Sequence, residues 1–555
     1  MISPRTIALS LEYHLLKKER ALLRGVVPAG LQSYLRRRAR AKYLVWEARA
    51  YNAWMSERLI QRRLEYAAPI EAGLLSVVTP VWDGTPLKYL RVLAESIIAQ
   101  NEDGHCEWVV VDNGCRKTEL LAYLTALRKY RWVAVHEAGE NAGIIGGLRL
   151  CLERAKGRYL LPVDSDDWLY PDCLRVVNRW LRKTGFAPLL YTDEDKLIGT
   201  RAVQPYFKPD FDPVLLLNSA YIAHLGVIDR ELALKLGAYS DKSTEGSPDW
   251  DLFVRFLAAG HTAVHIPEVV YSWRMHPEST ADDALSKPYI HASQKAVLQR
   301  YLNLRGMADD YAVEYSPLLN GTADWWLYRR QGQTWPTLKV LLGAAADYGD
   351  CLPLPVLDEM VGRQFAGTEG LVCLISKDLQ IDRPDWLDDA MALMERHPDT
   401  VMVGGCIRNK NGSILSAGYV LGFDGDCGCP DRGRPAIDPG YFTQLRKQRS
   451  VSAVSTELAV IRASFLRELV ASGVPSLASV PFLGAWAGAY ALRTGKRVVY
   501  SPFMSGVSGL DWDALIKPQE REAFRNANGD IFPDRRFYPG SFGLTTEEAY
   551  RLIPP

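Results

Sequence analysis

Short apolar runs alternate with longer segments through the first half of the chain. Four apolar runs predict strands, and three longer segments between them predict helices. The runs are residues 74–78, 108–111, 132–136 and 159–163, and the segments are residues 87–99, 121–130 and 148–155. This rhythm is typical of a parallel sheet, whose strand ends lie together along one edge. The pattern therefore predicts an α/β fold in which the residues that follow these strands share one rim.

Three carboxylates follow the fourth apolar run. Asp164, Asp166 and Asp167 lie between that run and a turn at Pro171, at the place where open α/β sheets bind their ligands. Oxygen ligands at this spacing suit Mg²⁺ or Mn²⁺, and such an ion bridges to the oxygens of a diphosphate. The alternative is that Asp166 or Asp167 caps a helix that begins near Trp168. The first interpretation implies an anionic, phosphate-bearing partner.

Composition narrows the class of protein. The 555 residues suggest about three folding units, and a formal net charge of +1 gives no reason to expect a nucleic-acid partner. The nine cysteines form no C-x-x-C pair, which favours a reducing cytoplasm. Cys427 and Cys429 alone are a weak zinc signal, so we expect free thiols. No signal-peptide pattern or apolar stretch of about 18 residues is present, so we expect no membrane span.

The N-terminal segment is basic. Residues 1–66 contain fourteen Lys or Arg and five Asp or Glu, a formal charge of +9 that leaves −8 for the remainder. Its apolar spacing is helical, with Trp46, Tyr51 and Trp54 interleaved. Basic helices with aromatic residues favour anionic membrane surfaces. The alternative is a set of helices with a solvated basic face, packed on the domain that follows.

Several motifs occur in a fixed order, and together they resemble the family 2 glycosyltransferases of the GT-A fold. The motifs are Thr79-Pro80-Val81-Trp82-Asp83, Val111-Asp112-Asn113-Gly114, Asn141-Ala142-Gly143 and Asp164-Ser165-Asp166-Asp167. Later motifs, within residues 191–196, 207–210, 265–267, 271–274 and 279–281, resemble multidomain bacterial enzymes of O-antigen, capsule and rhamnan assembly. The resemblance covers residues 70–310 strongly, and many ordered motifs are far more specific than one.

The resemblance implies an inverting, metal-dependent sugar transferase. Its donor would be a UDP-, GDP- or dTDP-linked sugar, and its acceptor a hydroxyl of a growing cell-surface glycan or lipid-linked glycan. The resemblance implies an enzyme that is cytoplasmic or peripheral at the inner face of the cell membrane, and it is compatible with a homo-oligomer. The donor base, the sugar and the linkage are not readable from these motifs.

The resemblance also implies roles for individual residues. Those expected to contact the nucleotide sugar are Pro80, Asp83, Asp112, Asn141, Gly143, Arg149, Asp164, Asp195, Arg274 and His276. Asp164 and Asp166 would hold the metal and the diphosphate, with Asp167 beside them. The family usually has Asn at position 83, and Arg149 is either a phosphate contact or a surface residue. Arg274 and His276 would stabilise the leaving diphosphate, and the charged run around Asp195 is expected at a strand end near the cleft.

A general base must remove the proton of the attacking hydroxyl. Residues 245–252 resemble the family's acidic motif at the start of a helix, and Asp249 is our choice for the base. Asp251 is the alternate, because two side chains this close on a helix diverge and only one can face the reacting carbon. Capping of the helix is the structural alternative for Asp249.

The last third of the chain repeats part of the first. Residues 370–386 resemble residues 157–172, and residues 489–502 resemble residues 254–267. In these alignments Ser376 stands for Asp164, Asp378 for Asp166, Gly484 for Asp249 and Trp486 for Asp251. We therefore predict a basic helical extension (1–69), a GT-A domain (70–334) and a degenerate GT-A-like module (335–555) that serves stability, acceptor binding or dimerisation.

Two other classes of protein compete with this interpretation. The whole chain could be a scaffold or glycan-binding subunit of a polysaccharide assembly complex, but a scaffold would have no reason to keep one complete set of carboxylates. A nucleotidyltransferase would be expected to carry a Gly- and Arg-rich phosphate loop after the first strand, where this chain has Thr79-Pro80-Val81-Trp82-Asp83.

Overall fold

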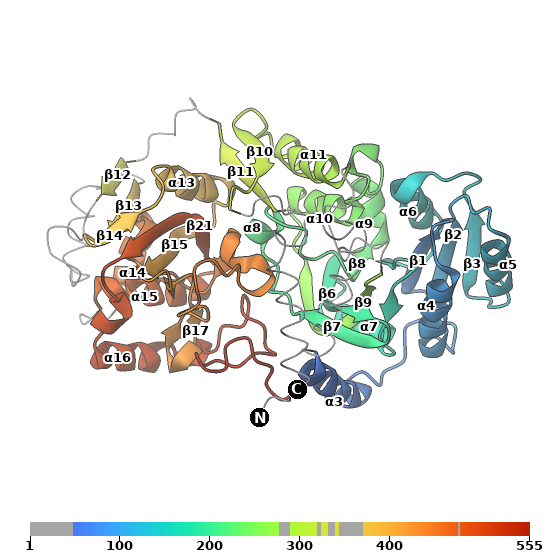
Figure 1. The fold of residues 1–555 in the computed structure, drawn as a ribbon, viewed down its shortest axis with the longest axis horizontal. Coiled ribbons are helices and arrows are strands. Elements are labelled where there is room, and N and C mark those ends of the chain that lie inside the picture. Colours follow the sequence, from blue (N-terminus) through green and yellow to red (C-terminus); the bar gives the residue numbers. More distant parts are fainter. Residues whose placement is uncertain (1–47, 277–288, 319–323, 331–338, 343–369, 475–477) are drawn as a thin grey trace, which may run out of the picture.

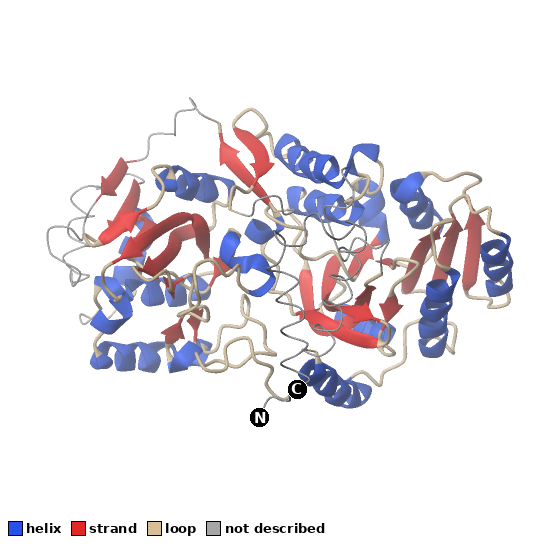
Figure 2. Ribbon diagram, in the orientation of Figure 1, coloured by secondary structure: helices blue, strands red, loops and turns tan. Residues whose placement is uncertain are grey.

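The computed structural model describes residues 48–276, 289–318, 324–330, 339–342, 370–474 and 478–555. Two sheets lie next to each other along the long axis of the molecule, one in each half of the chain (Figure 1). Figure 2 shows helices around the strands of both sheets. Among the described residues, no helix has the length and apolar character needed to cross a membrane.

The first sheet contains the strands predicted from the apolar runs. Its strands are β1 (Leu75–Val81), β2 (Glu107–Asp112), β3 (Val133–Glu137), β4 (Tyr159–Pro162), β5 (Trp168–Leu169), β6 (Leu189–Ile198), β7 (Arg201–Tyr206), β8 (Gly226–Asp229) and β9 (Val264–Arg274). Their order is β3-β2-β1-β4-β8-β6-β9-β5, with β7 paired to β6. Strands β1 to β4 are mutually parallel wherever they pair. The predicted parallel unit is confirmed, and its carboxyl ends form one rim.

Helices cover both faces of this sheet. They are α4 (Leu87–Gln100), α5 (Thr118–Leu127), α6 (Gly143–Arg154), α7 (Cys173–Lys183), α8 (Pro213–Leu216), α9 (Arg230–Lys235), α10 (Pro248–Ala258) and α11 (Tyr289–Leu304). Apolar side chains of α4, α5 and α7 pack in one core, and those of α6, α10 and α11 pack in another. Strand β2 is buried almost throughout, as expected for a strand covered on both sides.

One alternative interpretation and one local prediction are wrong. No helix begins near Trp168: residues 168–169 form β5, which pairs with β9, and α7 begins only at Cys173. Asp166 and Asp167 are therefore not helix caps. The charged run around Asp195 is also not at a strand end, because β6 continues to Ile198 and pairs with β7 and β9 there.

The second sheet repeats the topology of the first. Its strands are β12 (Lys339–Leu342), β13 (Gly370–Ile375), β14 (Leu379–Ile381), β15 (Thr400–Asn409), β16 (Ile414–Ser416), β19 (Arg449–Val451), β20 (Leu458–Arg462) and β21 (Arg497–Ser508). The order β12-β13-β20-β15-β21-β14 matches β1-β4-β8-β6-β9-β5, and each corresponding pair has the same direction. Counterparts of β2 and β3 do not occur in the described part of this sheet.

The helices of the second half follow the same plan. They are α13 (Trp386–Arg396), α14 (Ala463–Ala471), α15 (Val480–Arg493) and α16 (Pro518–Asn528). Along the chain, α13 lies between β14 and β15 as α7 lies between β5 and β6, and α15 precedes β21 as α10 precedes β9. The two halves pack directly on each other: the buried carboxylate of Asp212 accepts hydrogen bonds from the N–H and hydroxyl of Ser450, at 2.6 and 2.7 Å.

The last part of the basic N-terminal segment forms helix α3 (Arg49–Glu65), which packs on the first sheet. The Tyr51 hydroxyl donates to the Asp195 carboxylate at 2.7 Å, and the fully buried Arg62 pairs with Asp172. Trp54 donates to the carbonyl of Ile553 near the other end of the chain, at 2.8 Å. For α3, this packing favours the helix-on-domain interpretation. Residues 1–47 lie outside the described part of the chain.

Candidate active site

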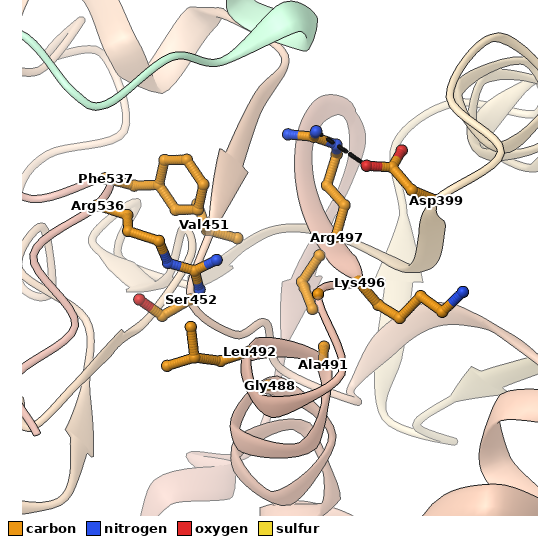
Figure 3. A pocket seen from close by; sticks show the side chains of 12 residues that line it. Asp399, Val451, Ser452, Gly488, Ala491, Leu492, Lys496, Arg497, Arg536 and Phe537 are labelled. Atoms are coloured by element: carbon orange, nitrogen blue, oxygen red, sulfur yellow. Dashed lines mark hydrogen bonds and ion pairs between the residues drawn. The ribbon is translucent and has the colours of Figure 1, made fainter. Parts of the chain in front are cut away.

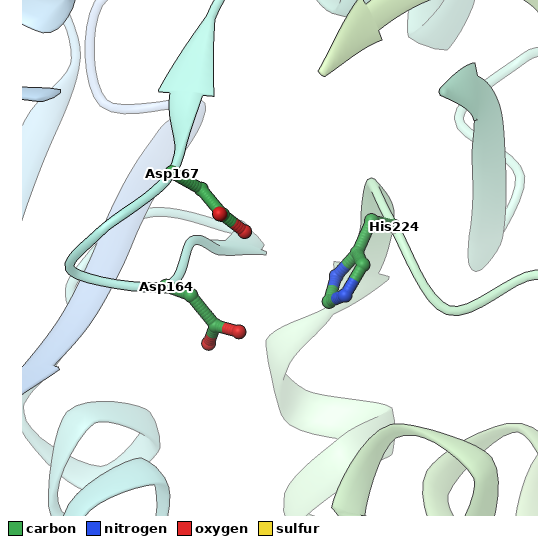
Figure 4. A group of neighbouring side chains, drawn as sticks. All are labelled: Asp164, Asp167 and His224. Atoms are coloured by element: carbon green, nitrogen blue, oxygen red, sulfur yellow. The ribbon is translucent and has the colours of Figure 1, made fainter. Parts of the chain in front are cut away.

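Two carboxylates and an imidazole meet at the carboxyl end of β4. Ligand atoms of Asp164, Asp167 and His224 all lie within 4.8 Å of one another, and Figure 4 shows the three side chains converging. Asp164 is exposed and Asp167 is buried. Carboxylate oxygens and an imidazole nitrogen at this separation are a donor set for a divalent cation, and the imidazole suits Mn²⁺ better than Mg²⁺, which prefers oxygen ligands.

Asp167 is held in place by two donors from β9. Its carboxylate accepts the hydroxyl of Tyr271, and the N–H of Arg274 donates to its other oxygen at 2.8 Å. Burial, followed by the charges of Asp166 and Asp164, raises the pKa of Asp167 well above its usual range. A cation bound beside it would reverse this effect, because positive charge favours the ionised carboxylate.

Asp166 belongs to a second group beside the first. Its carboxylate lies 2.6 Å from Nε2 of His276, and its carbonyl accepts from Nε of Arg274 at 2.7 Å. The Tyr89 ring lies against both side chains, 4.6 Å from the Arg274 guanidinium and 5.4 Å from the His276 ring. Nη2 of Arg274 is buried without a hydrogen-bond partner among the described residues. The structure thus brings Arg274 and His276 to Asp166, and their contact with a diphosphate stays a prediction.

His224 was not singled out from the sequence. It lies just before β8, its ring stacks on Tyr271 at 4.8 Å, and its carbonyl accepts from the buried ammonium of Lys208. A single histidine between Tyr221 and Leu225 carries no spacing signal. Only the pairing of β8 with β4 shows that it faces Asp164.

The two candidates for the general base, Asp249 and Asp251, lie in different environments. The Asp251 carboxylate is buried and pairs with Arg255 at 2.7 Å and with Arg300 at 2.6 Å. Asp249 forms no ion pair with another described residue. Burial raises its pKa to about 6, and the charged groups that act on it are His224 and Asp164. The charges of the metal-ligand group therefore act on Asp249, whereas the Asp251 carboxylate pairs with Arg300 of α11.

The predicted nucleoside residues lie on the rim formed by β1 and β2. Pro80 is on β1 beside Val111, and Asp112 ends β2, where Oδ1 accepts from the N–H of Cys115 at 2.8 Å. Oδ1 of Asp83 accepts from the N–H groups of Arg116 and Lys117, at 2.8 and 3.0 Å, and these hydrogen bonds lower the pKa of Asp83. Asp83 thus also fixes the loop that leads into α5.

The segment from Asn141 to Gly143 forms the start of α6. Oδ1 of Asn141 accepts from the N–H of Gly143 at 2.9 Å, and the Asn113 side chain bridges from the end of β2 to the Gly143 carbonyl at 2.8 Å. The carboxylate of Glu245 accepts from the N–H of Ile144 at 2.5 Å. Glu245 thereby ties the segment before Asp249 to the start of α6, where it complements the helix dipole.

Arg149 and Asp195 are placed away from the carboxylates of the rim. Arg149 pairs with Glu153 at 2.6 Å and donates to the Ala238 carbonyl at 3.2 Å. Asp195 is completely buried and accepts hydroxyls of Tyr51, Tyr170 and Ser272. Burial raises the pKa of Asp195 to about 7. In this arrangement, Asp195 holds α3 on the sheet.

A separate cavity of about 110 Å³ lies in the second half of the chain, between Arg497 and Arg536 (Figure 3). Arg497 pairs with Asp399 at 2.9 Å and Arg536 with Asp534 at 2.8 Å. Both of these guanidinium groups therefore already have carboxylate partners. Cys427 and Cys429 are buried, and neither forms a disulfide bond with another described residue.

Residues 76–206 match the family model "Glycosyl transferase family 2". The chain is 28% identical over 481 residues to "Uncharacterized protein y4gI" of Sinorhizobium fredii, covering 76% of this chain and 51% of that protein. It is 25% identical over 406 residues to "O-antigen biosynthesis protein RfbC" of Myxococcus xanthus, covering 64% and 31%. The chain therefore spans about half the length of these curated relatives, or less.

Similarity to solved structures is weak. S. aureus TarS 1-349 in complex with UDP-GlcNAc aligns with a TM-score of 0.34 and 18% identity, over 43% of this chain and 72% of that chain. The motifs, the family match and the sheet topology together identify the first half: the chain contains a glycosyl transferase family 2 domain with a GT-A fold.

Proposed function

We propose that the chain is an inverting, metal-dependent glycosyltransferase. It transfers a sugar from a nucleotide sugar to a hydroxyl of a growing cell-surface polysaccharide. The observation that carries this proposal is the convergence of Asp164, Asp167 and His224 within 4.8 Å of one another. The charges of His224 and Asp164 also act on Asp249. The name of the relative RfbC, an O-antigen biosynthesis protein, supports a polysaccharide as the acceptor.

The metal would be held by Asp164, Asp167 and His224, whose donor atoms fit a divalent cation. When bound, it supplies positive charge to the leaving diphosphate. Arg274 and His276 lie beside this group, where both contact Asp166. They offer hydrogen-bond donors to the same phosphates, and the Arg274 guanidinium adds positive charge. Asp112, Pro80 and Asp83 line the rim where the nucleoside would lie, since they end the adjacent strands β1 and β2.

Asp249 acts as the general base. It accepts the proton of the acceptor hydroxyl while the oxygen forms a bond to the anomeric carbon, and the bond from that carbon to the diphosphate breaks on the opposite face. A carboxylate with a pKa of about 6 is a stronger base than an ordinary aspartate and is still ionised at neutral pH. The ion pairs of Asp251 hold the helix that presents it.

In this proposal, the second half of the chain is a GT-A-like module that lacks the catalytic base and a metal ligand of the first domain. Its shared strand order and directions support a common origin with the first sheet. Ser376 replaces Asp164, and Gly484 replaces Asp249 on the corresponding helix α15. A Cβ atom at Gly484 would lie 1.9 Å from the Val454 carbonyl oxygen. Close packing therefore occupies the place where the first domain carries its base.

The test is a donor panel. Release of nucleoside diphosphate is measured from UDP, GDP and dTDP sugars with Mn²⁺ or Mg²⁺, and donor binding is measured by calorimetry. We expect metal-dependent binding and release with one nucleoside, both lost in Asp164→Ala. Asp378→Ala, a change at an aspartate of the second half, is the matched control and should behave as the wild type. Absence of both binding and release with every donor would contradict the proposal.

A further inference from the structure

A cavity of about 990 Å³ lies between the two halves of the chain. Its wall includes Arg58 of α3, Lys208 and His265 of the first domain, and Arg493 of α15. Residues of the segment 531–541, near the end of the chain, complete the wall. This volume is at the upper end of the range for pockets that hold drug-sized ligands. The cavity is therefore large enough for a ligand of more than one sugar ring.

The cations in this wall contact carboxylates, with the exception of Arg535. Arg535 is half-buried and forms no ion pair with another described residue. Burial lowers the pKa of Arg535, as expected for a cation whose charge is not compensated. The other contacts are Arg58 with Glu268, Lys208 with Glu194, His265 with Asp193 and Asp210, Arg493 with Asp530, and Arg536 with Asp534.

The guanidinium of Arg535 is fixed on one side and unused on the other. Its Nη1 donates to the carbonyls of Pro539 and Phe542, at 3.0 and 2.9 Å. Nε and Nη2 have no hydrogen-bond partner among the described residues. A guanidinium can bind a carboxylate through two such nitrogens, with two parallel hydrogen bonds. Because the two carbonyls already fix the group, little ordering is needed when an anion binds.

The carboxylates in the wall restrict the kind of anion. Asp193, Asp210, Glu268 and Asp534 all line the cavity, and the Asp210 side chain is the most open of them, at 56% exposed. These groups would repel a densely charged ligand such as a nucleoside diphosphate, but they accept hydrogen bonds from hydroxyl groups. A single negative group among many hydroxyls is the pattern of an acidic sugar.

Lys208 connects the cavity to the active site. Its N–H donates to the Asp193 carboxylate at 2.7 Å, and its buried ammonium donates to the carbonyl of His224. Lys208 and Asp193 both line the cavity. The wall of the cavity therefore also supports the residue whose imidazole belongs to the metal-ligand group, and a ligand could lie beside that group without occupying it.

We propose that this cavity binds an acidic segment of the acceptor glycan, with a carboxylate of the glycan on Arg535 and its hydroxyls on the carboxylates of the wall. This inference rests on the proposed function, in which the acceptor is a growing polysaccharide. It adds that this polysaccharide carries uronic acids. It also gives the second half of the chain a role, because α15 and the segment 531–541 form one side of the acceptor site.

The experiment measures binding to the full chain by calorimetry, without donor. The probes are a hexamer of galacturonic acid, a hexamer of alternating glucuronic acid and N-acetylglucosamine, and their uncharged methyl esters. We expect the wild type to bind at least one acidic hexamer at least about tenfold more tightly than its ester, which cannot pair with Arg535. Arg535→Gln should remove this preference. Arg525→Gln, the same change on α16 outside the cavity wall, should keep it.

Gly540→Glu tests the site without removing a native side chain. Gly540 lines the cavity, and a Cβ atom there would meet nothing within 4 Å. The added carboxylate should weaken binding of the acidic hexamer at least about tenfold and leave binding of the ester unchanged. Gly529→Glu is the matched control, because Gly529 is equally open and lies outside the cavity wall.

Three results would overturn the inference alone. They are equal affinity for each acidic hexamer and its ester, including no binding of either, unchanged binding in both Arg535→Gln and Gly540→Glu, and inorganic phosphate that binds as tightly as the hexamers. The last result would indicate a simple anion site. Because these titrations contain no donor, a wild type that releases no nucleoside diphosphate from any donor would contradict the proposed function and leave the glycan-binding result standing.

Discussion

Replacement of Asp249 by Asn should remove activity and stabilise the fold at the same time. Burial raises the pKa of this carboxyl group from 3.8 to about 6, so the folded protein resists its ionisation. Below pH 3.8, the group is protonated in both the folded and the unfolded chain and has no effect. Between pH 3.8 and 6, only the unfolded chain releases the proton, and stability falls as the pH rises. Above pH 6, the cost is constant, at roughly 3 kcal/mol.

Asn cannot ionise, so the gain in unfolding free energy of Asp249→Asn over the wild type should grow from pH 4 to pH 6 and then level off. Transfer should fall by about 10² to 10⁴, the usual contribution of a general base. For the wild type, kcat/KM should rise with pH through about 6, because only the ionised carboxylate accepts the proton. Urea unfolding and a pH–rate profile measure these effects.

Asp251→Asn is the control on the same helix. It removes one partner from two ion pairs at 2.7 and 2.6 Å and should destabilise the fold by about 3 kcal/mol. Turnover above a tenth of the wild-type rate in Asp249→Asn would refute its assignment as the base. A stability difference from the wild type that did not change between pH 4 and pH 8 would refute the electrostatic reasoning.

Three further predictions follow from the packing. His224→Ala should weaken Mn²⁺ binding at least about tenfold, measured by calorimetry without donor; unchanged affinity would exclude His224 as a ligand. Arg62→Ala should lower the free energy of unfolding, measured with urea, by about 3 kcal/mol, because it leaves Asp172 without its buried partner. The control Arg63→Ala, at an exposed position, should lower it by less than about 0.5 kcal/mol. Gly484→Ala should lower the free energy of unfolding by about 2 kcal/mol, because the added Cβ atom would lie 1.9 Å from the Val454 carbonyl oxygen. Gly529→Ala, which meets nothing within 4 Å, should be neutral, and equal effects of the two glycine changes would contradict this explanation.

The sequence predicted the parts of the site that depend on strand ends. Asp164 and Asp167 follow an apolar run, and parallel pairing of β1, β2 and β4 brings Asp112 to the same rim. Contacts between distant segments were not readable. Arg300 lies 49 residues from Asp251, and its ion pair turns Asp251 away from Asp164.

Asp195 shows the same limitation. Its charged neighbours suggested a strand end near the cleft, but hydroxyls from α3, Tyr170 and β9 allow the carboxylate to be buried inside β6. These donors come from three separate places in the chain, so no local pattern indicates them. His224 carried no signal for the corresponding reason, since its neighbours Asp164 and Asp167 lie in the loop between β4 and β5.

The tight contact at Gly484 limits how the second half of the chain could evolve. Helix α15 approaches the backbone around Val454 (the 454 segment) so closely that no residue larger than glycine fits at position 484 unless this backbone moves. A mutation that restored aspartate there would introduce a side chain where the backbone of Val454 already lies. Recovery of a base by a single substitution is therefore sterically blocked, and the 454 segment would have to move first. If the two halves share an origin, as proposed above, this packing makes the loss of the carboxylate difficult to reverse.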